Sequence, residues 1–151
     1  MAVAVPVAGC GGHRRDQGRA APFQLDDVRQ PGTTVALPAG KPVVLNFFAA
    51  WCDPCRAELP RFARADRAAR GSVAFVGVDV ADNRRNAAAL LDQAGVGFPA
   101  GYDPGRGVAA RFGVKGIPTT VFVNADGRVD AVVRGPLSAA SLRRHVARLT
   151  A

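Results

Sequence analysis

The sequence predicts an α/β domain in which a mixed central sheet is flanked by helices. Two continuous apolar runs, residues 43–48 and 73–80, are typical of central strands that are covered on both faces. A helical pattern follows each run, over residues 53–70 and 82–93. Residues 119–134 then contain two short strands around an Asn-Ala-Asp-Gly turn, which adds antiparallel pairing. With 151 residues, of which 48% are hydrophobic, the chain suits one domain with one core.

Two short strands are expected in front of this core. Residues 23–25 and 33–37 each alternate apolar and other side chains, as edge strands do. Turns rich in Pro and Gly bound the second of these segments. We therefore expect a short N-terminal β-hairpin extension, and we place the folded domain at residues 23–151.

Two segments precede the predicted domain. Residues 1–10 are apolar up to Cys10, and Val-Ala-Gly-Cys10 resembles a bacterial lipobox, in which the cysteine is lipidated. A secretory signal has a basic start and an uninterrupted apolar stretch, whereas this segment has no basic residue and is interrupted by Pro6. It is therefore either a truncated lipoprotein-type signal and anchor or a frayed apolar terminus. Residues 11–22 show no apolar periodicity and predict a flexible linker.

The helix predicted over residues 53–70 carries an apolar stripe, made of Leu59, Phe62, Ala65 and Ala69. Pro60 lies inside this helix, so a kink is expected there, and Gly71 is expected to end the helix. Asp82 or Asn83 can cap the next helix.

The second half of the chain contains shorter elements. Residues 98–101 predict a short strand or turn, and a short helix opens at Pro104 and ends at Gly113. Ser138 is expected to cap the last helix. His145 flanks the apolar stripe of that helix, which favours a partly buried packing role over a catalytic one.

Two cysteines fall where the first central strand passes into a helix. Cys52 lies at the predicted helix start, since Asp53 and Pro54 occupy the first turn, and Cys55 lies one turn further on. Unpaired N–H groups and the helix dipole stabilise a thiolate at Cys52. Cys55 is then close enough to attack a mixed disulfide formed on Cys52. This layout predicts a thiol–disulfide exchange site, with a buried inert pair or a permanent disulfide as the alternative.

Glu58-Leu-Pro60 follows the cysteine pair, and Gly116-Ile-Pro-Thr119 forms a second motif further along the chain. With these motifs the chain resembles the thioredoxin superfamily, and within it the membrane-anchored, extracytoplasmic thiol–disulfide oxidoreductases of the TlpA/ResA type. Glu58-Leu-Pro60 resembles that group's Glu-x-Pro, and Gly116-Ile-Pro-Thr119 resembles its second signature. Asn46 agrees with the anchored group, whereas cytoplasmic thioredoxins carry a buried Asp at the matching position. The resemblance covers residues 31–149 and implies a thioredoxin-like fold.

The resemblance also implies roles for the residues of the site. Cys52 is expected to be the nucleophile and Cys55 the resolving thiol. Glu58, one turn beyond Cys55, is expected to accept the proton that Cys55 loses, the alternative being an ordinary solvated glutamate. The pair itself is the redox centre, so no cofactor is expected.

Three further residues are expected at the surface or floor of this site. Pro118 matches the superfamily's cis-proline, which would leave the backbone of Ile117 free to pair with an extended substrate segment. Trp51, beside the pair, is expected to contact substrate. Asn46 is expected to orient a water or backbone group, or to be a satisfied core amide.

The composition makes several other classes of function less favoured. The net charge is +8, but 18 of the 20 basic residues are Arg, and they are scattered without interleaved aromatic residues. This favours an Arg-rich composition over a nucleic-acid partner. Cys10 and His13 could join the pair in a zinc site, but they lie in a Gly-rich tail, so no metal is expected. No run approaches the roughly 18 apolar residues that a membrane-spanning helix needs.

These observations and the resemblance lead to one favoured function. We expect a monomeric thiol–disulfide oxidoreductase outside the cytoplasm, anchored through Cys10 or secreted, that acts on protein cysteines as a reductant. Apocytochrome c or a copper-site assembly factor would be its substrates, and a membrane thiol–disulfide relay its electron donor. The alternatives are a disulfide-forming oxidase, a non-catalytic thioredoxin-like module and a thiol peroxidase. A peroxidase is poorly supported, because Leu45 and Ala49 stand where peroxiredoxins carry Pro and Thr.

Overall fold

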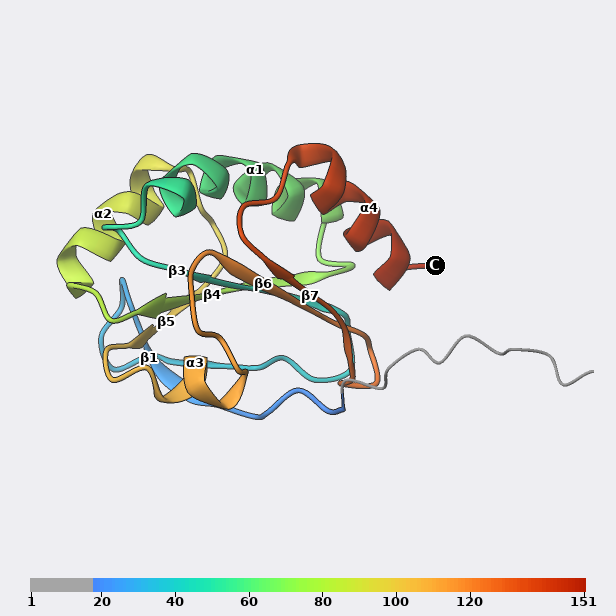
Figure 1. Cartoon of the computed structure of the whole chain (residues 1–151), viewed down its shortest axis with the longest axis horizontal. Coiled ribbons are helices and arrows are strands. Elements are labelled where there is room, and N and C mark those ends of the chain that lie inside the picture. The colour runs from blue at the N-terminus through green and yellow to red at the C-terminus, as the bar shows by residue number, and fades with distance from the viewer. Residues whose placement is uncertain (1–17) are drawn as a thin grey trace, which may run out of the picture.

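The structure is a computed structural model that describes residues 18–151. The predicted anchor with Cys10, and residues 11–17 of the predicted linker, lie outside the described residues. The described chain forms, in order, β1 (Gln24–Asp27), β2 (Thr34–Ala36), β3 (Val43–Phe48), α1 (Asp53–Ala69), β4 (Ala74–Val80), α2 (Arg84–Gln93), β5 (Ala100–Asp103), α3 (Gly107–Arg111), β6 (Thr119–Val123), β7 (Val129–Arg134) and α4 (Ala139–Leu149) (Figure 1).

The strands form one mixed sheet in the order β2-β1-β5-β4-β3-β6-β7. The two apolar runs become β3 and β4, which pair in parallel, and β5 continues the parallel part next to β4. The other neighbours, β1–β2, β1–β5, β3–β6 and β6–β7, pair antiparallel. This confirms the mixed sheet and the N-terminal hairpin. However, β1 lies inside the sheet between β2 and β5, so the prediction of two edge strands is wrong for β1.

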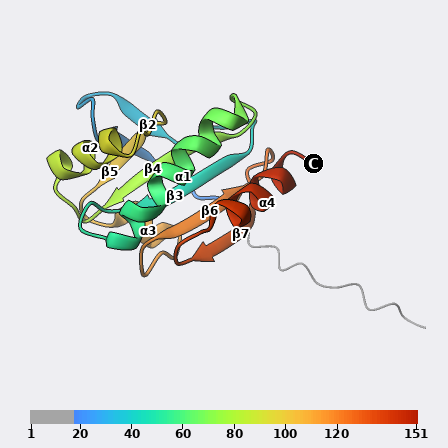
Figure 2. The same ribbon diagram turned by 90° about the horizontal axis from the view of Figure 1, so that it is seen from above.

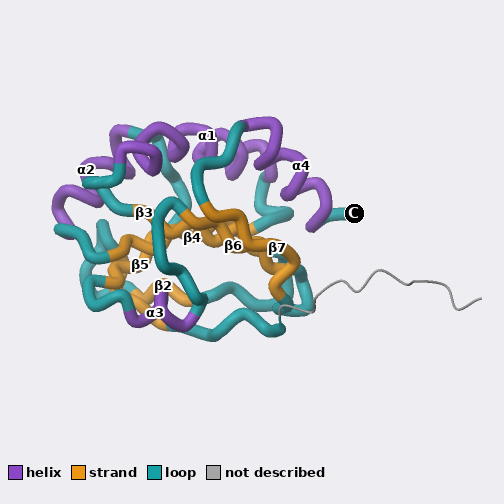
Figure 3. The backbone as a smooth tube through the Cα atoms, viewed as in Figure 1, coloured by secondary structure: helices purple, strands orange, loops and turns teal. Residues whose placement is uncertain are grey.

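Helices cover both faces of the sheet. Figure 1 shows α1, α2 and α4 on one face and the short α3 on the other. Seen from above, α2 lies toward β5, α1 over the centre and α4 toward β7 (Figure 2). The sheet thus lies between the layer of three helices and α3, as the tube view shows (Figure 3). The buried apolar side chains form two clusters accordingly, one beneath the three helices and one on the α3 face.

Several predicted boundaries shift by a few residues. Arg70, in the left-handed region with φ of 49°, is the C-cap of α1, although Gly71 was the predicted end. Residues 98–101, predicted as a strand or turn, lead into β5, and α3 begins at Gly107 with Arg106 as its N-cap. Propensity patterns locate such short elements poorly, because neighbouring strands decide where their pairing starts.

The caps of the two other long helices are as predicted. Asn83 caps α2 by accepting hydrogen bonds from the N–H groups of Arg85 and Asn86. Ser138 caps α4 by accepting one from the N–H of Ser141. The neighbouring Asp82 therefore has another role, which concerns the functional site.

The first described residues lie against the β6–β7 turn. The N–H of Ala20 donates to the carbonyl of Gly127, and the N–H of Val129 donates to the carbonyl of Gly18. The folded part thus includes residues 18–22, so the predicted linker over residues 11–22 extends too far toward the domain. No helix among residues 18–151 has the length and apolar character that spanning a membrane requires.

Candidate active site

Cys52 is the N-cap residue of α1, as the strand-to-helix pattern predicts. Its backbone is extended, with φ of −95° and ψ of 104°, and its Sγ accepts a 3.3 Å hydrogen bond from the N–H of Cys55. Pro54 occupies the first turn, where a missing N–H has no consequence, and Asp53 is exposed beside it. A helix N-terminus in this position stabilises negative charge on Cys52 when the sulfur is a thiolate.

The two cysteines form a disulfide, with their Cα atoms 5.3 Å apart. Cys52 is 6% exposed and Cys55 is fully buried, so Cys52 is the more accessible residue of the two. The division into an attacking and a resolving thiol stays a prediction, for which this difference in burial is favourable. The position of the pair does not favour an inert disulfide, because the loop directly before Cys52 reaches the surface at Trp51, which is 60% exposed.

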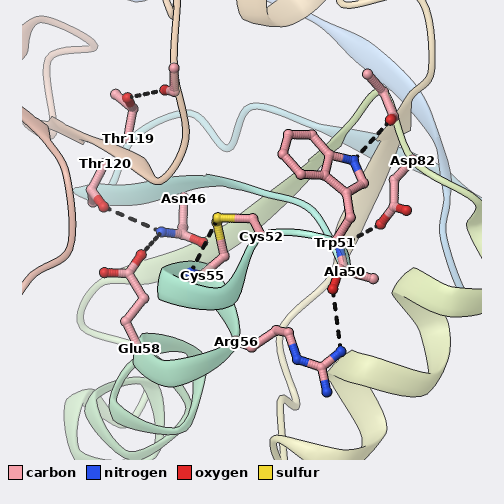
Figure 4. Close-up of a disulfide and its surroundings, with 12 residues drawn as sticks. Asn46, Ala50, Trp51, Cys52, Cys55, Arg56, Glu58, Asp82, Thr119 and Thr120 are labelled. Atoms are coloured by element: carbon pink, nitrogen blue, oxygen red, sulfur yellow. Dashed lines mark hydrogen bonds between the residues drawn. A yellow bond between two sulfur atoms is a disulfide. The ribbon is translucent and has the colours of Figure 1, made fainter.

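The loop that carries Trp51 is tied to the end of β4. The N–H of Ala50 donates a 2.6 Å hydrogen bond to Asp82 Oδ2, and Trp51 Nε1 donates a 3.1 Å bond to the carbonyl of Ala81. Figure 4 shows both bonds on the side of the disulfide opposite Glu58. From the sequence, Asp82 is predicted only as a helix cap. Asp82 follows β4, which is parallel to β3, and parallel strands end at the same edge of a sheet. This position could have indicated that Asp82 lies next to the loop that follows β3.

Glu58 lies beneath the disulfide and is fully buried, which excludes the solvated glutamate considered above. Its Oε1 accepts a 2.9 Å hydrogen bond from Asn46 Nδ2, and its Oε2 accepts a 2.9 Å bond from the N–H of Leu137. Burial raises the pKa of Glu58 above its ordinary value, and the bonds from Leu137 and Asn46, together with the charge of Arg61, offset part of this rise. A carboxyl group with a raised pKa is a stronger base than an ordinary glutamate, which suits it to accept a proton from a nearby thiol.

Asn46 points from β3 toward Glu58 and the disulfide (Figure 4). Besides Glu58, it donates a 3.3 Å hydrogen bond to Thr120 Oγ1 of β6, while its buried Oδ1 has no partner among the described residues. We expected Asn46 to orient a water or a backbone group, or to be a satisfied amide. The expectations of a backbone partner and of a fully satisfied amide are wrong, since both described partners are side chains and Oδ1 has none among residues 18–151, whereas the orientation of a water by Asn46 stays a prediction.

Pro118 lies at the same edge of the sheet as Cys52, because Thr119 pairs with Phe47 across β6 and β3. The Ile117–Pro118 bond is cis, which confirms the prediction made from the resemblance. The carbonyl of Pro118 accepts a hydrogen bond from the N–H of Gly135. The backbone groups of Ile117 bond to no other described residue, so they remain able to pair with an extended segment.

Asp79, near the carboxyl end of β4, is a buried ionisable residue that the sequence analysis did not single out. Its side chain is fully buried, and neither oxygen has a hydrogen-bond partner among the described residues. Burial, together with the nearby carboxylate of Asp82, raises the pKa of Asp79 to about 9. Asp79 is therefore an uncharged acid at neutral pH, close to the residue that holds the active-site loop.

His145 lies away from this site. Its ring stacks on Phe122 with centroids 4.4 Å apart, which confirms the packing role. No group of three or more His, Cys, Asp or Glu side chains among residues 18–151 is arranged to hold a metal ion.

The comparison with known proteins adds to this geometry. The pattern of the AhpC/TSA family matches residues 17–132. The thiol–disulfide oxidoreductase ResA of Bacillus subtilis is 32% identical over 124 residues, which are 81% of this chain and 69% of ResA. Among solved structures, DsbF of Mycobacterium tuberculosis superposes with a TM-score of 0.76 at 32% identity, covering 85% of this chain and 95% of DsbF. A secreted disulfide oxidoreductase of the same organism, homologous to DsbE, gives a TM-score of 0.75 at 26% identity, covering 84% and 96% of the two chains.

Proposed function

Because the chain belongs to the AhpC/TSA family and is a thiol–disulfide oxidoreductase similar to ResA, we propose that it reduces disulfides of other proteins outside the cytoplasm. The observation that supports this best is the Cys52–Cys55 disulfide at the N-terminus of α1, with a buried carboxyl group beneath it.

The proposed reaction has two thiol–disulfide exchange steps. In the reduced enzyme, the Cys52 thiolate attacks one sulfur of the substrate disulfide, which forms a mixed disulfide and releases the other substrate sulfur as a thiolate. Cys55 then loses its proton and attacks Cys52 Sγ, which forms the Cys52–Cys55 disulfide and releases the second substrate thiolate. Two electrons pass from the enzyme to the substrate, and the two substrate thiolates take up protons.

Glu58 is proposed to accept the proton of Cys55 in the second step. Three features support this role: its complete burial, its position one turn after Cys55 on α1, and its raised pKa. The bonds from Asn46 and Leu137 occupy one acceptor site on each oxygen and hold the carboxyl group in place. Each oxygen keeps a further lone pair for a proton.

Substrate contact is proposed at Trp51 and at the backbone of Ile117. Trp51 is exposed next to Cys52, and the unused backbone groups of Ile117 lie before β6 at the same edge of the sheet. An extended segment of the substrate can pair with Ile117 as an added strand. The resemblance implies apocytochrome c or a copper-site assembly factor as the protein that supplies this segment, and a membrane thiol–disulfide relay that returns electrons to the enzyme.

The reducing direction is proposed from charge. Asp53 and Glu58 place carboxyl groups near Cys52, and negative charge there disfavours the thiolate and hence the dithiol form. The N–H of Cys55 and the dipole of α1 act in the opposite sense, but they belong to every site of this geometry. A disulfide-forming oxidase is the second candidate because of this opposing effect, and the redox potential decides between the two.

Two further parts of the proposal concern the setting of the enzyme. We propose that Cys10 anchors a monomeric protein to the outer face of the membrane. The Val-Ala-Gly-Cys10 stretch supports the anchor. The similar disulfide oxidoreductase of Mycobacterium tuberculosis is a secreted protein, which supports a location outside the cytoplasm.

An insulin-reduction assay driven by dithiothreitol tests the proposed activity. The wild type is expected to accelerate insulin precipitation, and Cys52→Ser is expected to lose this activity. Cys55→Ser should form a mixed disulfide that persists, since no resolving thiol remains. Full activity of Cys52→Ser would overturn the proposed function.

A further inference from the structure

A groove of about 530 Å³ lies beside Trp51, between the active-site loop and α2. Its walls include Ala50 and Trp51 on one side and Asn86 and Leu90 of α2 on the other. The groove thus shares two residues with the loop that precedes Cys52. Whatever occupies it lies close to a molecule that is bonded to Cys52.

The polar lining of this groove has unused hydrogen-bond donors. Asp82 Oδ2 already accepts from the N–H of Ala50, and Asp82 Oδ1 from the N–H of Asn83. The Oδ1 of Asn83 accepts the two capping hydrogen bonds of α2, so the NH₂ group of Asn83 remains able to donate to a bound segment. Asn86 and Gln93 add two further amides to the lining.

Arg56 supplies an unpaired positive charge. Its Nη1 donates a 3.3 Å hydrogen bond to the carbonyl of Ala50, which uses one of five N–H donors. No carboxylate among residues 18–151 forms an ion pair with it, and its side chain is exposed. Figure 4 shows its guanidinium below Ala50, on the same side as Trp51.

Negative charge near Arg56 is limited. Arg56 and Asp82 are the charged residues of the lining, and two backbone N–H groups bind the carboxylate of Asp82. Asp53, although exposed on the first turn of α1, does not line the groove, and Asp79 is buried and uncharged at neutral pH. Among the residues that line the groove, the guanidinium of Arg56 is therefore the positively charged group, and it has no ion-pair partner within residues 18–151.

We propose that this groove binds the segment of a substrate protein next to its target cysteine, and that Arg56 selects a glutamate or aspartate in that segment. The inference rests on the proposed function, because it concerns the substrate of the same site. Arginine binds a carboxylate through parallel N–H bonds, and the side-chain amides of the lining can donate to the remaining lone pairs. The Trp51 ring and Leu90 offer apolar contact to the aliphatic part of the same segment.

Reduction of synthetic peptides tests this inference. Each substrate is the symmetric disulfide of a peptide with one cysteine, and a single glutamate or glutamine is placed in turn at each of the four positions on either side. We expect one or two adjacent positions on one side where glutamate raises kcat/KM about fivefold over glutamine, since exposed ion pairs are worth at most this much. The ratio is expected to fall in high salt.

Variants of the enzyme assign the effect to Arg56. In Arg56→Gln the ratio is expected to fall to about one, and in Arg56→Glu to below one. Arg64→Gln is the matched control, because it removes the same charge from an exposed position on the same helix outside the groove, and it should keep the preference.

Two results would overturn the inference alone. One is a ratio near one at every position while the glutamine peptides are reduced, and the other is a preference that survives in Arg56→Gln. Failure to reduce any peptide or insulin would overturn the proposed function as well.

Discussion

Asn46 of β3 donates a 2.9 Å hydrogen bond to Glu58 of α1, so two side chains connect the central strand to the helix beneath the disulfide. The amide holds one carboxyl oxygen, and the N–H of Leu137 holds the other. Glu58 is thereby fixed within the core at one turn from Cys55, which is the position that the proposed proton transfer requires.

Glu58→Gln is expected to slow the release of substrate from the mixed disulfide by about 10²-fold, the lower end of general-base effects. The wild-type rate should rise with pH through the pKa of Glu58, which burial places above 4.5, and the variant should lack this rise. Stopped-flow kinetics of a preformed mixed disulfide measures both. The alkylation rate of Cys52 in the reduced protein is the control for a disturbed fold. Equal release rates and pH profiles would exclude Glu58 as the base.

Cys52 is expected to be the thiol that reacts with iodoacetamide after reduction at mildly acidic pH. Its sulfur lies at the helix N-terminus and accepts the N–H of Cys55, whereas Cys55 is fully buried. Mass mapping of the labelled peptides measures the distribution, and Cys52→Ser and Cys55→Ser identify each product. Preferential labelling of Cys55 would contradict the assigned roles.

The redox midpoint is expected nearer to the thioredoxin value of about −270 mV than to the DsbA value of about −120 mV. Equilibration with dithiothreitol or glutathione buffers measures it, and Trp51, the single tryptophan of the chain, reports the state by fluorescence. Asp53→Asn should shift the midpoint toward less negative values, because removal of a negative charge stabilises the thiolate of the reduced form. A wild-type midpoint less negative than about −180 mV would favour the oxidase.

Asp79→Asn is expected to stabilise the protein increasingly as pH rises. Burial raises the pKa of folded Asp79 from 3.8 to about 9, so the folded chain binds more protons than the unfolded chain between these values. Its stability therefore falls as pH rises through this window, and the neutral variant lacks this contribution. Urea unfolding should show the advantage of the variant growing by on the order of 1 kcal/mol or more from pH 5 to pH 8.

Asp126→Asn, in the exposed β6–β7 turn, is the control for this experiment and should show no comparable growth. An advantage of Asp79→Asn that is the same at both pH values would show that Asp79 ionises normally in the folded protein.

Cys10 is expected to carry a lipid that holds the mature protein outside the cytoplasm. Expression of the gene with its upstream region, followed by membrane fractionation and mass analysis, tests this. Cys10→Ala should release the protein from the membrane fraction. An unmodified Cys10 in a soluble cytoplasmic product would exclude the anchor.

Much of the fold, and the position of the cysteine pair at the centre of the site, could be predicted from local sequence patterns. The apolar run of β3 and the Asp53–Pro54 helix start placed Cys52 at the N-cap, because strand patterns and helix caps depend on neighbouring residues. Likewise, the caps of α2 and α4 and the β6–β7 turn were predicted from single residue types at fixed offsets. The cis bond before Pro118 was predicted from the resemblance alone.

Tertiary structure decided what surrounds the disulfide. The bond from Leu137 to Glu58 spans 79 residues, and it comes from a backbone N–H, which every residue but proline carries. The bond from Ala50 to Asp82 exists because β3 and β4 are parallel neighbours that end at one edge. The order of strands in the sheet likewise determines the inner position of β1. It also determines the burial of Asp79, whose side-chain oxygens have no hydrogen-bond partner within residues 18–151, and the groove that Arg56 lines. The sequence by itself thus determined which two cysteines form the disulfide at the helix N-terminus, since helix capping is local. Only the packing of distant segments determined which other side chains lie around it.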